Sequence, residues 1–204
     1  MRKLHYVLLS FVLLLSYQCT SGKRDFENGD IIFQTSKSDQ SKAIQIATKS
    51  KYSHMGIIYK MNDEVFVYEA IQPIMLTRLE DWIERGEKEH YVVKRLKNSE
   101  EILTPEKLLK MEAVGKKYFA KDYDPYFEWS DSRIYCSELV WKIYKEALDI
   151  EIGALEELGS FDLTNEAVQK KMMERYGDNI PKDELVISPG AMFNSEKLKT
   201  VYKN

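Results

Sequence analysis

The sequence predicts an α+β fold, in which an antiparallel β-sheet packs against helices and a cysteine lies at the N-terminus of one helix. Short β-rich runs separated by turn residues fill the first half of the chain, whereas longer stretches of helical periodicity fill the second half. The chain of 204 residues is 44% hydrophobic and rich in tyrosine and phenylalanine, which is enough for a sizeable core. No repeat or linker divides residues 29–204, so we expect a single domain there.

The first half of the chain reads as a sheet with two short helices. Asn28-Gly29 is a turn signal that precedes a strand, and two β-rich runs separated by Lys60–Asp63 predict a hairpin. The apolar spacing in 38–50 predicts a helix. The expected strands are 31–33, 54–59, 64–71 and 91–96, with an extended piece at 74–76 and helices at 38–50 and 79–85.

Helices dominate the second half. Thr104 and Pro105 form a helix start, because a capping hydroxyl precedes a proline at the first helical position, and this helix is expected to end near Phe119. A loop rich in aromatic residues follows at 123–129. The next helix is expected to begin near Ser132, capped by Asp131 or Ser132, and to run to about Leu148. The tail predicts a helix at 165–176, a strand at 185–187 and a last helix after Ser188-Pro189-Gly190.

The N-terminus has the pattern of an export signal. Arg2 and Lys3 precede the apolar run 6–17, which is shorter than the about 20 residues needed to cross a bilayer. The run ends at Cys19, which predicts a lipoprotein signal over 1–18, lipidation of Cys19 and a tether over 19–28. Gln18 departs from the small residue usual before such a cysteine, and simple secretion or a retained anchor are the alternatives. We therefore expect an exported protein, anchored to a membrane of the bacterial envelope through its lipidated N-terminus.

The charge balance argues against a nucleic-acid partner. The chain has 33 acidic and 30 basic side chains, a formal net charge of −3, and shows no basic stripe. Proteins that bind phosphate backbones usually show such an excess. We expect a small peptide or amide substrate instead.

Cys136 is the first candidate for chemistry. If Cys19 is lipidated, Cys136 is the only free thiol of an exported chain, where an unused thiol is a liability. It lies in the predicted first turn of a helix, where unpaired N–H groups stabilise a thiolate. The alternative is a small apolar residue on the buried stripe of that helix.

His54 and Glu69 are the candidate partners of this thiol. A thiolate nucleophile needs a base within hydrogen-bond reach, and His54 begins a predicted strand on the same face as Gly56, which leaves room for close approach. Glu69 lies on the neighbouring strand and could fix the imidazole by a hydrogen bond. A structural histidine and a solvated glutamate are the alternatives. Zinc binding by the three residues is a further one, although no C-x-x-C or H-E-x-x-H spacing is present.

Four motifs together resemble one known family. G-D-I-I-F (29–33), Y-S-H-M-G-I-I-Y (52–59), V-Y-E-A (67–70) and Y-C-S-E-L-V-W-K-I-Y (135–144) resemble the circularly permuted branch of the NlpC-type papain-like superfamily of bacterial amidases and cysteine peptidases. In unpermuted members the cysteine helix comes first, whereas here the G-D and H-x-G strands precede it. The resemblance covers residues 29 to about 148, and V-I-S-P-G-A-M (186–192) adds weaker support.

The resemblance implies the role of each site residue. Cys136 would be the nucleophile, His54 the general base and then acid, and Glu69 the group that orients the imidazole, with no metal or organic cofactor. The Cys136 N–H would be one oxyanion donor. Tyr123, Tyr135 and Ser137 are the candidates for further oxyanion or substrate contacts. Cell-wall members usually carry Asp before the cysteine, and Tyr135 in that position puts stem-peptide specificity in question.

The expected function is a cysteine-dependent amidase or peptidase that acts on peptide, cell-wall or lipid amides in the bacterial envelope. An acyltransferase with the same three residues is one alternative, although such enzymes show an N-C-E-H-F type motif and this chain reads Y-C-S-E-L. The other alternative is an envelope binding module without catalysis. Loss of turnover in Cys136→Ala with the fold preserved distinguishes the hydrolase from the binding module.

Overall fold

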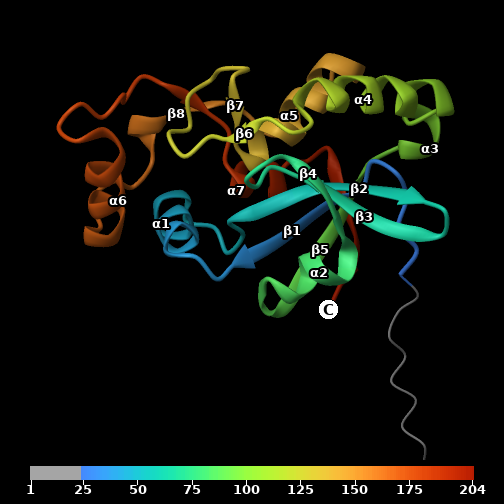
Figure 1. Cartoon of the computed structure of the whole chain (residues 1–204), viewed down its shortest axis with the longest axis horizontal. Helices are drawn as coiled ribbons and strands as arrows, with labels where there is room; N and C mark the ends of the chain where they lie inside the picture. The colour runs from blue at the N-terminus through green and yellow to red at the C-terminus, as the bar shows by residue number, and fades with distance from the viewer. Residues whose placement is uncertain (1–23) are drawn as a thin grey trace, which may run out of the picture.

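A computed structural model describes residues 24–204, which form a six-stranded antiparallel sheet with helices on both faces (Figure 1). The predicted signal peptide over 1–18, the lipidation site Cys19 and the first part of the tether lie outside the described residues. The strand order is β10-β5-β1-β2-β3-β4. The bounds are β1 (Ile31–Ser36), β2 (His54–Met61), β3 (Glu64–Glu69), β4 (Met75–Arg78), β5 (Gly86–Leu96) and β10 (Leu198–Lys203).

The alternation of apolar side chains in the central strands builds a core on each face of the sheet. Ile31 and Phe33 of β1 point to one face, and Ile32 between them points to the other; all three are fully buried. Helices α4 (Pro105–Tyr118) and α5 (Cys136–Leu148) cover the first face, as Figure 1 shows, and α5 packs directly on β2. Helix α2 (Leu79–Glu84) covers the second face with the buried ring of Trp82.

The remaining helices and short strands lie outside the six-stranded sheet. Helices α1 (Asp39–Thr48) and α6 (Glu166–Tyr176) contact each other at one end of the molecule (Figure 1). Ser38 caps α1, and the Asn165 side chain caps α6. The other elements are α3 (Ser99–Ile102), β6 (Asp122–Tyr123), β7 (Arg133–Ile134), β8 (Glu156–Glu157), the 3₁₀ turn η1 (Leu158–Ser160), β9 (Leu185–Val186) and α7 (Pro189–Phe193).

Two expectations from the sequence are wrong. Helix α5 begins at Cys136 and not near Ser132, because Arg133 and Ile134 pair in parallel with Asp122 and Tyr123. Asp131 therefore does not cap this helix. The tail also ends differently: α7 is short, and β10 follows it along the free edge of β5.

The G-D motif at the start of β1 has a structural role. Asp30 is fully buried, and both of its carboxylate oxygens accept hydrogen bonds from the Arg95 guanidinium, at 2.7 and 2.8 Å. A bidentate pair of this kind is strong and directional, and a buried carboxylate without a partner would be costly. The pair ties β1 to its neighbour β5.

Candidate active site

The three predicted catalytic residues lie at the ends of three elements that meet. His54 is the first residue of β2, Glu69 is the last residue of β3, and Cys136 is the first residue of α5. Because β2 and β3 form an antiparallel hairpin, the start of one strand lies beside the end of the other. The packing of α5 on β2 then brings the helix start to the same place.

Gly56 allows the two strands to approach closely next to His54. A Cβ atom at this position would lie 2.5 Å from the Cγ1 atom of Val67 and 2.7 Å from the carbonyl oxygen of Tyr68. Real Cβ contacts do not reach such distances, so any larger residue would push the hairpin apart. The H-x-G motif therefore fixes the distance between the histidine strand and the glutamate strand.

Cys136 is buried at the first helical position, with 4% of its surface exposed. The N–H group of a first helical residue has no acceptor inside the helix, so it is available to an oxyanion formed next to the sulfur. The same helix end favours a negative charge on the thiol. The sequence predicted Cys136 in the first turn of a helix that starts near Ser132, whereas the structure makes Cys136 the first helical residue.

His54 lies between the thiol and the carboxylate. Its Nε2 atom is 2.6 Å from Glu69 Oε2, and its other nitrogen, Nδ1, is the one available to Cys136. The ring stacks on Trp82, with the two ring centroids 6.0 Å apart. Burial lowers the pKa of His54, but the hydrogen bonds to Cys136 and Glu69 outweigh it and raise the pKa to about 10. The imidazole is therefore held as a cation between two groups that favour its charged form.

Glu69 is fully buried and well supplied with hydrogen-bond donors. Its Oε1 atom accepts hydrogen bonds from the Thr77 hydroxyl, at 2.5 Å, and from the Arg85 guanidinium. Burial alone would raise the pKa of Glu69, but the hydrogen bond from His54 and the contacts with Thr77 and Arg85 hold it below the usual value. No local pattern marks Thr77 or Arg85, because their link to Glu69 depends on how β4 and the end of α2 fold back.

Tyr135 and Ser137 hold the start of α5 in place. The Tyr135 hydroxyl accepts a hydrogen bond from Ile187 N at 3.0 Å, and the Ser137 hydroxyl donates to Ile187 O at 2.7 Å. Both side chains are almost fully buried. These contacts anchor the two residues, and both also line the pocket beside Cys136, so the oxyanion or substrate contact expected of them stays a prediction.

Tyr123 lies on the cysteine side of the site. Its hydroxyl accepts a hydrogen bond of 2.6 Å from the Gln40 side chain, and Gln40 lines the same pocket as Cys136. Burial, followed by the nearby Cys136, raises the pKa of Tyr123, so the phenol stays protonated and can donate. Gln40 was missed by the sequence reading, since nothing local to its helix marks it.

An apolar pocket opens beside the sulfur. It has a volume of about 70 Å³ and lies between α1, α6, the start of α5 and the segment 186–189. One water needs roughly 10–15 Å³ by the same measure, so the pocket has room for several heavy atoms. Its apolar walls are formed by Ala43, Ile44, Ala47, Phe127, Leu158, Phe161, Leu163, Val168, Met172, Val186, Ile187 and Pro189.

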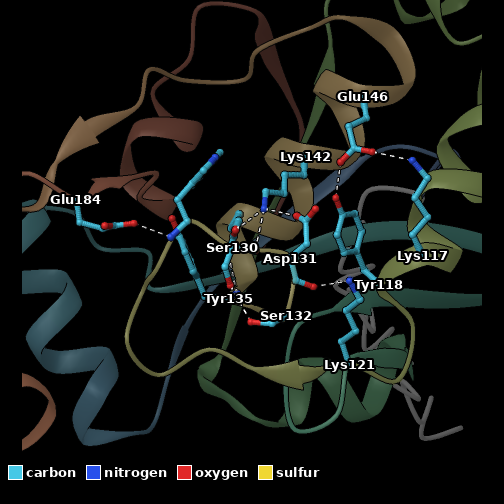
Figure 2. Close-up of polar contacts among 12 residues, drawn as sticks. Lys117, Tyr118, Lys121, Ser130, Asp131, Ser132, Tyr135, Lys142, Glu146 and Glu184 are labelled. Carbon is cyan, nitrogen blue, oxygen red and sulfur yellow. Dashed lines mark hydrogen bonds and ion pairs between the residues drawn. The ribbon is translucent and has the colours of Figure 1, made fainter.

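The aromatic loop that carries Tyr123 and Phe127 is fastened to α5. Figure 2 shows Lys142 directed from the helix to this loop, where it donates to Ser130 O at 2.9 Å and pairs with Asp131 at 2.7 Å. The Glu184 carboxylate accepts a hydrogen bond from Trp129 N at 2.7 Å. The end of the loop is thus held by α5 on one side and by Glu184 on the other, and these contacts fix this wall of the pocket.

Comparison with known proteins identifies the family. Residues 25–202 match the model of a family described as permuted papain-like amidase enzyme, YaeF/YiiX, C92 family. The chain belongs to this family. It is 48% identical over 177 residues to the uncharacterized protein YiiX of Escherichia coli (strain K12), covering 87% of this chain and 86% of that protein.

A solved structure agrees with the fold. The crystal structure described as metalloprotein yiiX from Escherichia coli O157:H7, DUF1105, matches with a TM-score of 0.83 and 48% identity, over 87% of this chain and 97% of that chain. The permuted papain-like fold predicted from the motif order is therefore confirmed.

Two further properties concern residues 24–204. No group of three or more His, Cys, Asp or Glu side chains in this part of the chain is arranged to hold a metal ion. Within the same range, no helix is long and apolar enough to cross a membrane.

Proposed function

We propose that this protein is a cysteine amidase that cleaves amides with a short apolar acyl group, using Cys136, His54 and Glu69. The observation that carries the proposal is the convergence of the Cys136 thiol, the His54 imidazole and the fully buried Glu69 carboxylate next to an apolar pocket, with Glu69 Oε2 2.6 Å from His54 Nε2. Nucleophile, base and orienting group in mutual contact are the signature of nucleophilic catalysis. The amidase family supports the same reaction class.

The first step acylates the enzyme. The Cys136 sulfur attacks the amide carbonyl carbon, a carbon–sulfur bond forms, and the carbonyl electron pair moves onto the oxygen. The Cys136 N–H and the Tyr123 hydroxyl are the donors we assign to this oxyanion. As the carbon–nitrogen bond breaks, the His54 imidazolium gives its proton to the leaving amine, and a thioester remains.

The second step releases the acid. The now neutral His54 takes a proton from a water that attacks the thioester carbonyl, and the sulfur leaves as a thiolate. Glu69 keeps the ring plane and the tautomer fixed through both steps, because its hydrogen bond to Nε2 leaves Nδ1 toward the sulfur. The Glu69 carboxylate in turn is held by Thr77 and Arg85.

The pocket supports an acyl group of limited length. Its volume corresponds to roughly five to seven water-sized units, one for each carbon beyond the carbonyl. This matches an acyl group of about six to eight carbons when the carbonyl carbon is counted. Each methylene that enters the pocket should improve binding by about 0.8 kcal/mol, and further methylenes should add nothing. An apolar wall of this kind offers a polar cell-wall peptide few hydrogen-bonding groups, which favours the lipid-like class among the substrates considered.

We also propose that the enzyme works outside the cytoplasm, attached by lipid on Cys19. The support is the apolar run 6–17 that ends at this cysteine. Metabolic labelling with a fatty-acid analogue tests it: label that depends on Cys19, and disappears in Cys19→Ser, is expected, and unlabelled secreted protein contradicts it.

Turnover of p-nitroanilides with acyl chains of two to twelve carbons tests the amidase proposal. We expect a maximum at six to eight carbons and a loss of at least about 10³-fold in Cys136→Ala and His54→Ala. His90→Ala is the matched control, because the His90 ring bonds Asn204 O and stacks on Tyr52, and makes no hydrogen bond with Cys136, His54 or Glu69 among the described residues. Mass spectrometry should detect the free acid. Equal turnover by wild type and Cys136→Ala would refute the proposal, and acyl transfer to an added amine in place of water would favour the transferase.

Reactivity of the thiol provides a test that needs no substrate. An ordinary thiol, with a pKa near 8.5, is about 1% ionised at pH 6.5 and is alkylated slowly there. We expect iodoacetamide to modify Cys136 rapidly at pH 6.5, since a protonated His54 stabilises the thiolate. His54→Ala should slow the reaction at least about tenfold. An alkylation rate that follows an ordinary thiol in both proteins would contradict the pair.

A further inference from the structure

One face of α6 changes from apolar to charged as it passes along the pocket. Val168, Met172 and Arg175 follow one another at helical spacings of four and three residues, so they share a face. All three line the pocket, where the first two are buried and Arg175 is half-buried. Arg175 is the only basic side chain among the described residues that line this pocket. A half-buried cation in an otherwise apolar wall favours a ligand that carries an anion.

Phe127 holds the guanidinium at its place in the pocket. The Arg175 guanidinium carbon lies 4.7 Å from the centroid of the Phe127 ring. Phe127 itself has a positive φ of 56°, which is uncommon for a bulky residue, and its ring packs edge-on against Tyr135 at 5.1 Å. A guanidinium stacked on an aromatic ring keeps its N–H edge free for a planar anion.

No protein carboxylate neutralises this charge. Among residues 24–204, none lies within ion-pair distance of Arg175, whereas Lys171 on the same helix pairs with Glu174 at 2.6 Å. The guanidinium is therefore available to a ligand.

Arg175 and Cys136 line the same pocket. The pKa of the Tyr123 phenol is raised by Cys136 and lowered by Arg175, which agrees with this arrangement. A single ligand in the pocket can therefore contact the sulfur and the guanidinium together, with its apolar chain along Val168 and Met172.

We propose that Arg175 binds the carboxylate of an amino-acid leaving group, so that the substrates are N-acyl amino acids with a short acyl chain. This inference rests on the proposed amidase function and names its substrate class. A carboxylate offers two oxygens to the planar guanidinium, which gives the pair both strength and direction. The carboxylate of the amino acid is separated from the amide nitrogen by one carbon, so one small ligand presents both groups to the pocket that Cys136 and Arg175 line.

Binding to the Cys136→Ala variant tests the proposal without turnover. N-octanoylglycine and N-octanoylglycinamide have the same chain and amide and differ only in the charged group, so calorimetric titration of both isolates the carboxylate. We expect N-octanoylglycine to bind at least tenfold more tightly. Arg175→Gln in the same background should abolish this preference, and Arg175→Lys should keep part of it. Lys170→Gln is the matched control, because it removes an exposed cation from the same helix and should leave the preference intact.

The outcomes separate this inference from the amidase proposal. Equal affinity of Cys136→Ala for the two ligands overturns the role of Arg175, and so does a preference that survives Arg175→Gln. If the acid is preferred but wild type hydrolyses neither compound, the amidase proposal fails and the carboxylate site stands. If wild type hydrolyses both with the same kcat/KM, the amidase stands and the carboxylate site fails. If an Arg175 variant does not fold, the comparison of the two ligands on Cys136→Ala still tests whether the pocket binds a carboxylate.

Discussion

Glu69 and Glu138 are two fully buried carboxylates close to the same nucleophile, and their pKa values are shifted in opposite directions. Glu69 accepts hydrogen bonds from His54, Thr77 and Arg85, and its pKa is lowered. Glu138 has fewer donors. Its Oε2 atom accepts a weak bond from Tyr135 N at 3.3 Å, and burial raises its pKa to about 8 in spite of Lys142.

The contact between Glu138 and Lys142 is an ion pair rather than a directed hydrogen bond. Lys142 Nζ lies 2.8 Å from Glu138 Oε1, yet this oxygen has no hydrogen-bond partner of acceptable geometry in residues 24–204. Lys142 directs its donors to Ser130 O and Asp131, as Figure 2 shows. Desolvation is therefore the larger influence on Glu138, and it raises the pKa of this carboxyl in spite of the nearby ammonium.

The difference between Glu69 and Glu138 shows that burial by itself does not indicate a catalytic carboxylate. What distinguishes Glu69 is the number and direction of the donors that hold it charged next to an imidazole. Glu138 instead accepts a hydrogen bond from the start of α5 and pairs with Lys142, which in turn fastens the loop beside α5. Glu69 variants should therefore change the rate, whereas Glu138 variants should change stability.

The largest expected difference is in activity. Glu69→Gln should lower kcat/KM about 100-fold, because the amide does not stabilise the imidazolium, whereas Glu138→Gln should stay within about threefold of wild type. Both variants replace a buried carboxyl group with an amide of the same shape, so each is the control for the other. Steady-state kinetics with an octanoyl amide provides the measurement. Equal losses in the two variants would contradict the comparison.

Lys142→Met should lower the free energy of unfolding by about 2 kcal/mol, because it releases Ser130 and Asp131 and leaves Glu138 without its cation. Urea unfolding measures this change. Adding Glu138→Gln to Lys142→Met should restore part of the loss, since it removes the stranded carboxylate. A double variant no more stable than Lys142→Met would show that the loop contacts account for the whole effect.

Stability should depend on pH through Glu138. Its folded pKa of about 8 exceeds the unfolded value near 4.5, so between these values the folded state binds the extra proton and stability falls as pH rises. Below pH 4.5 both states are protonated, and above pH 8 the penalty is complete. Thermal unfolding measures the effect. The free energy of unfolding of wild type should fall, relative to that of Glu138→Gln, by about 1–2 kcal/mol between pH 5 and pH 8.5. A constant difference between the two would contradict the shift.

The smallest expected effect is that of Arg85→Gln. This side chain is 41% exposed, and water can replace much of its interaction with Glu69. We expect a loss of about threefold in kcat/KM and a smaller alkylation rate of Cys136 at pH 6.5, with the fold intact. A loss as large as that of Glu69→Gln would show that Arg85 is essential for the position of the carboxylate.

Much of the fold follows from local sequence. Neighbours along the chain set the apolar periodicity of the β1, β2 and β3 segments. They also set the helix caps at Thr104 and Ser188, and each of these elements forms where it was expected. The boundary of α5 and the existence of β10 were not predicted, because both depend on pairing with strands far away in sequence. A two-residue strand such as β7 has no pattern of its own that sequence reading can detect.

The sequence alone therefore determined the residue types, the strand and helix faces and the motif order that places a cysteine helix after a histidine strand. Only the tertiary structure decided which polar groups surround them. Thr77, Arg85, Gln40 and Arg175 reach the site from four different elements, so no spacing along the chain relates them to Cys136. Local propensity acts over a few residues, whereas donors and charges act through space, and folding sets those distances.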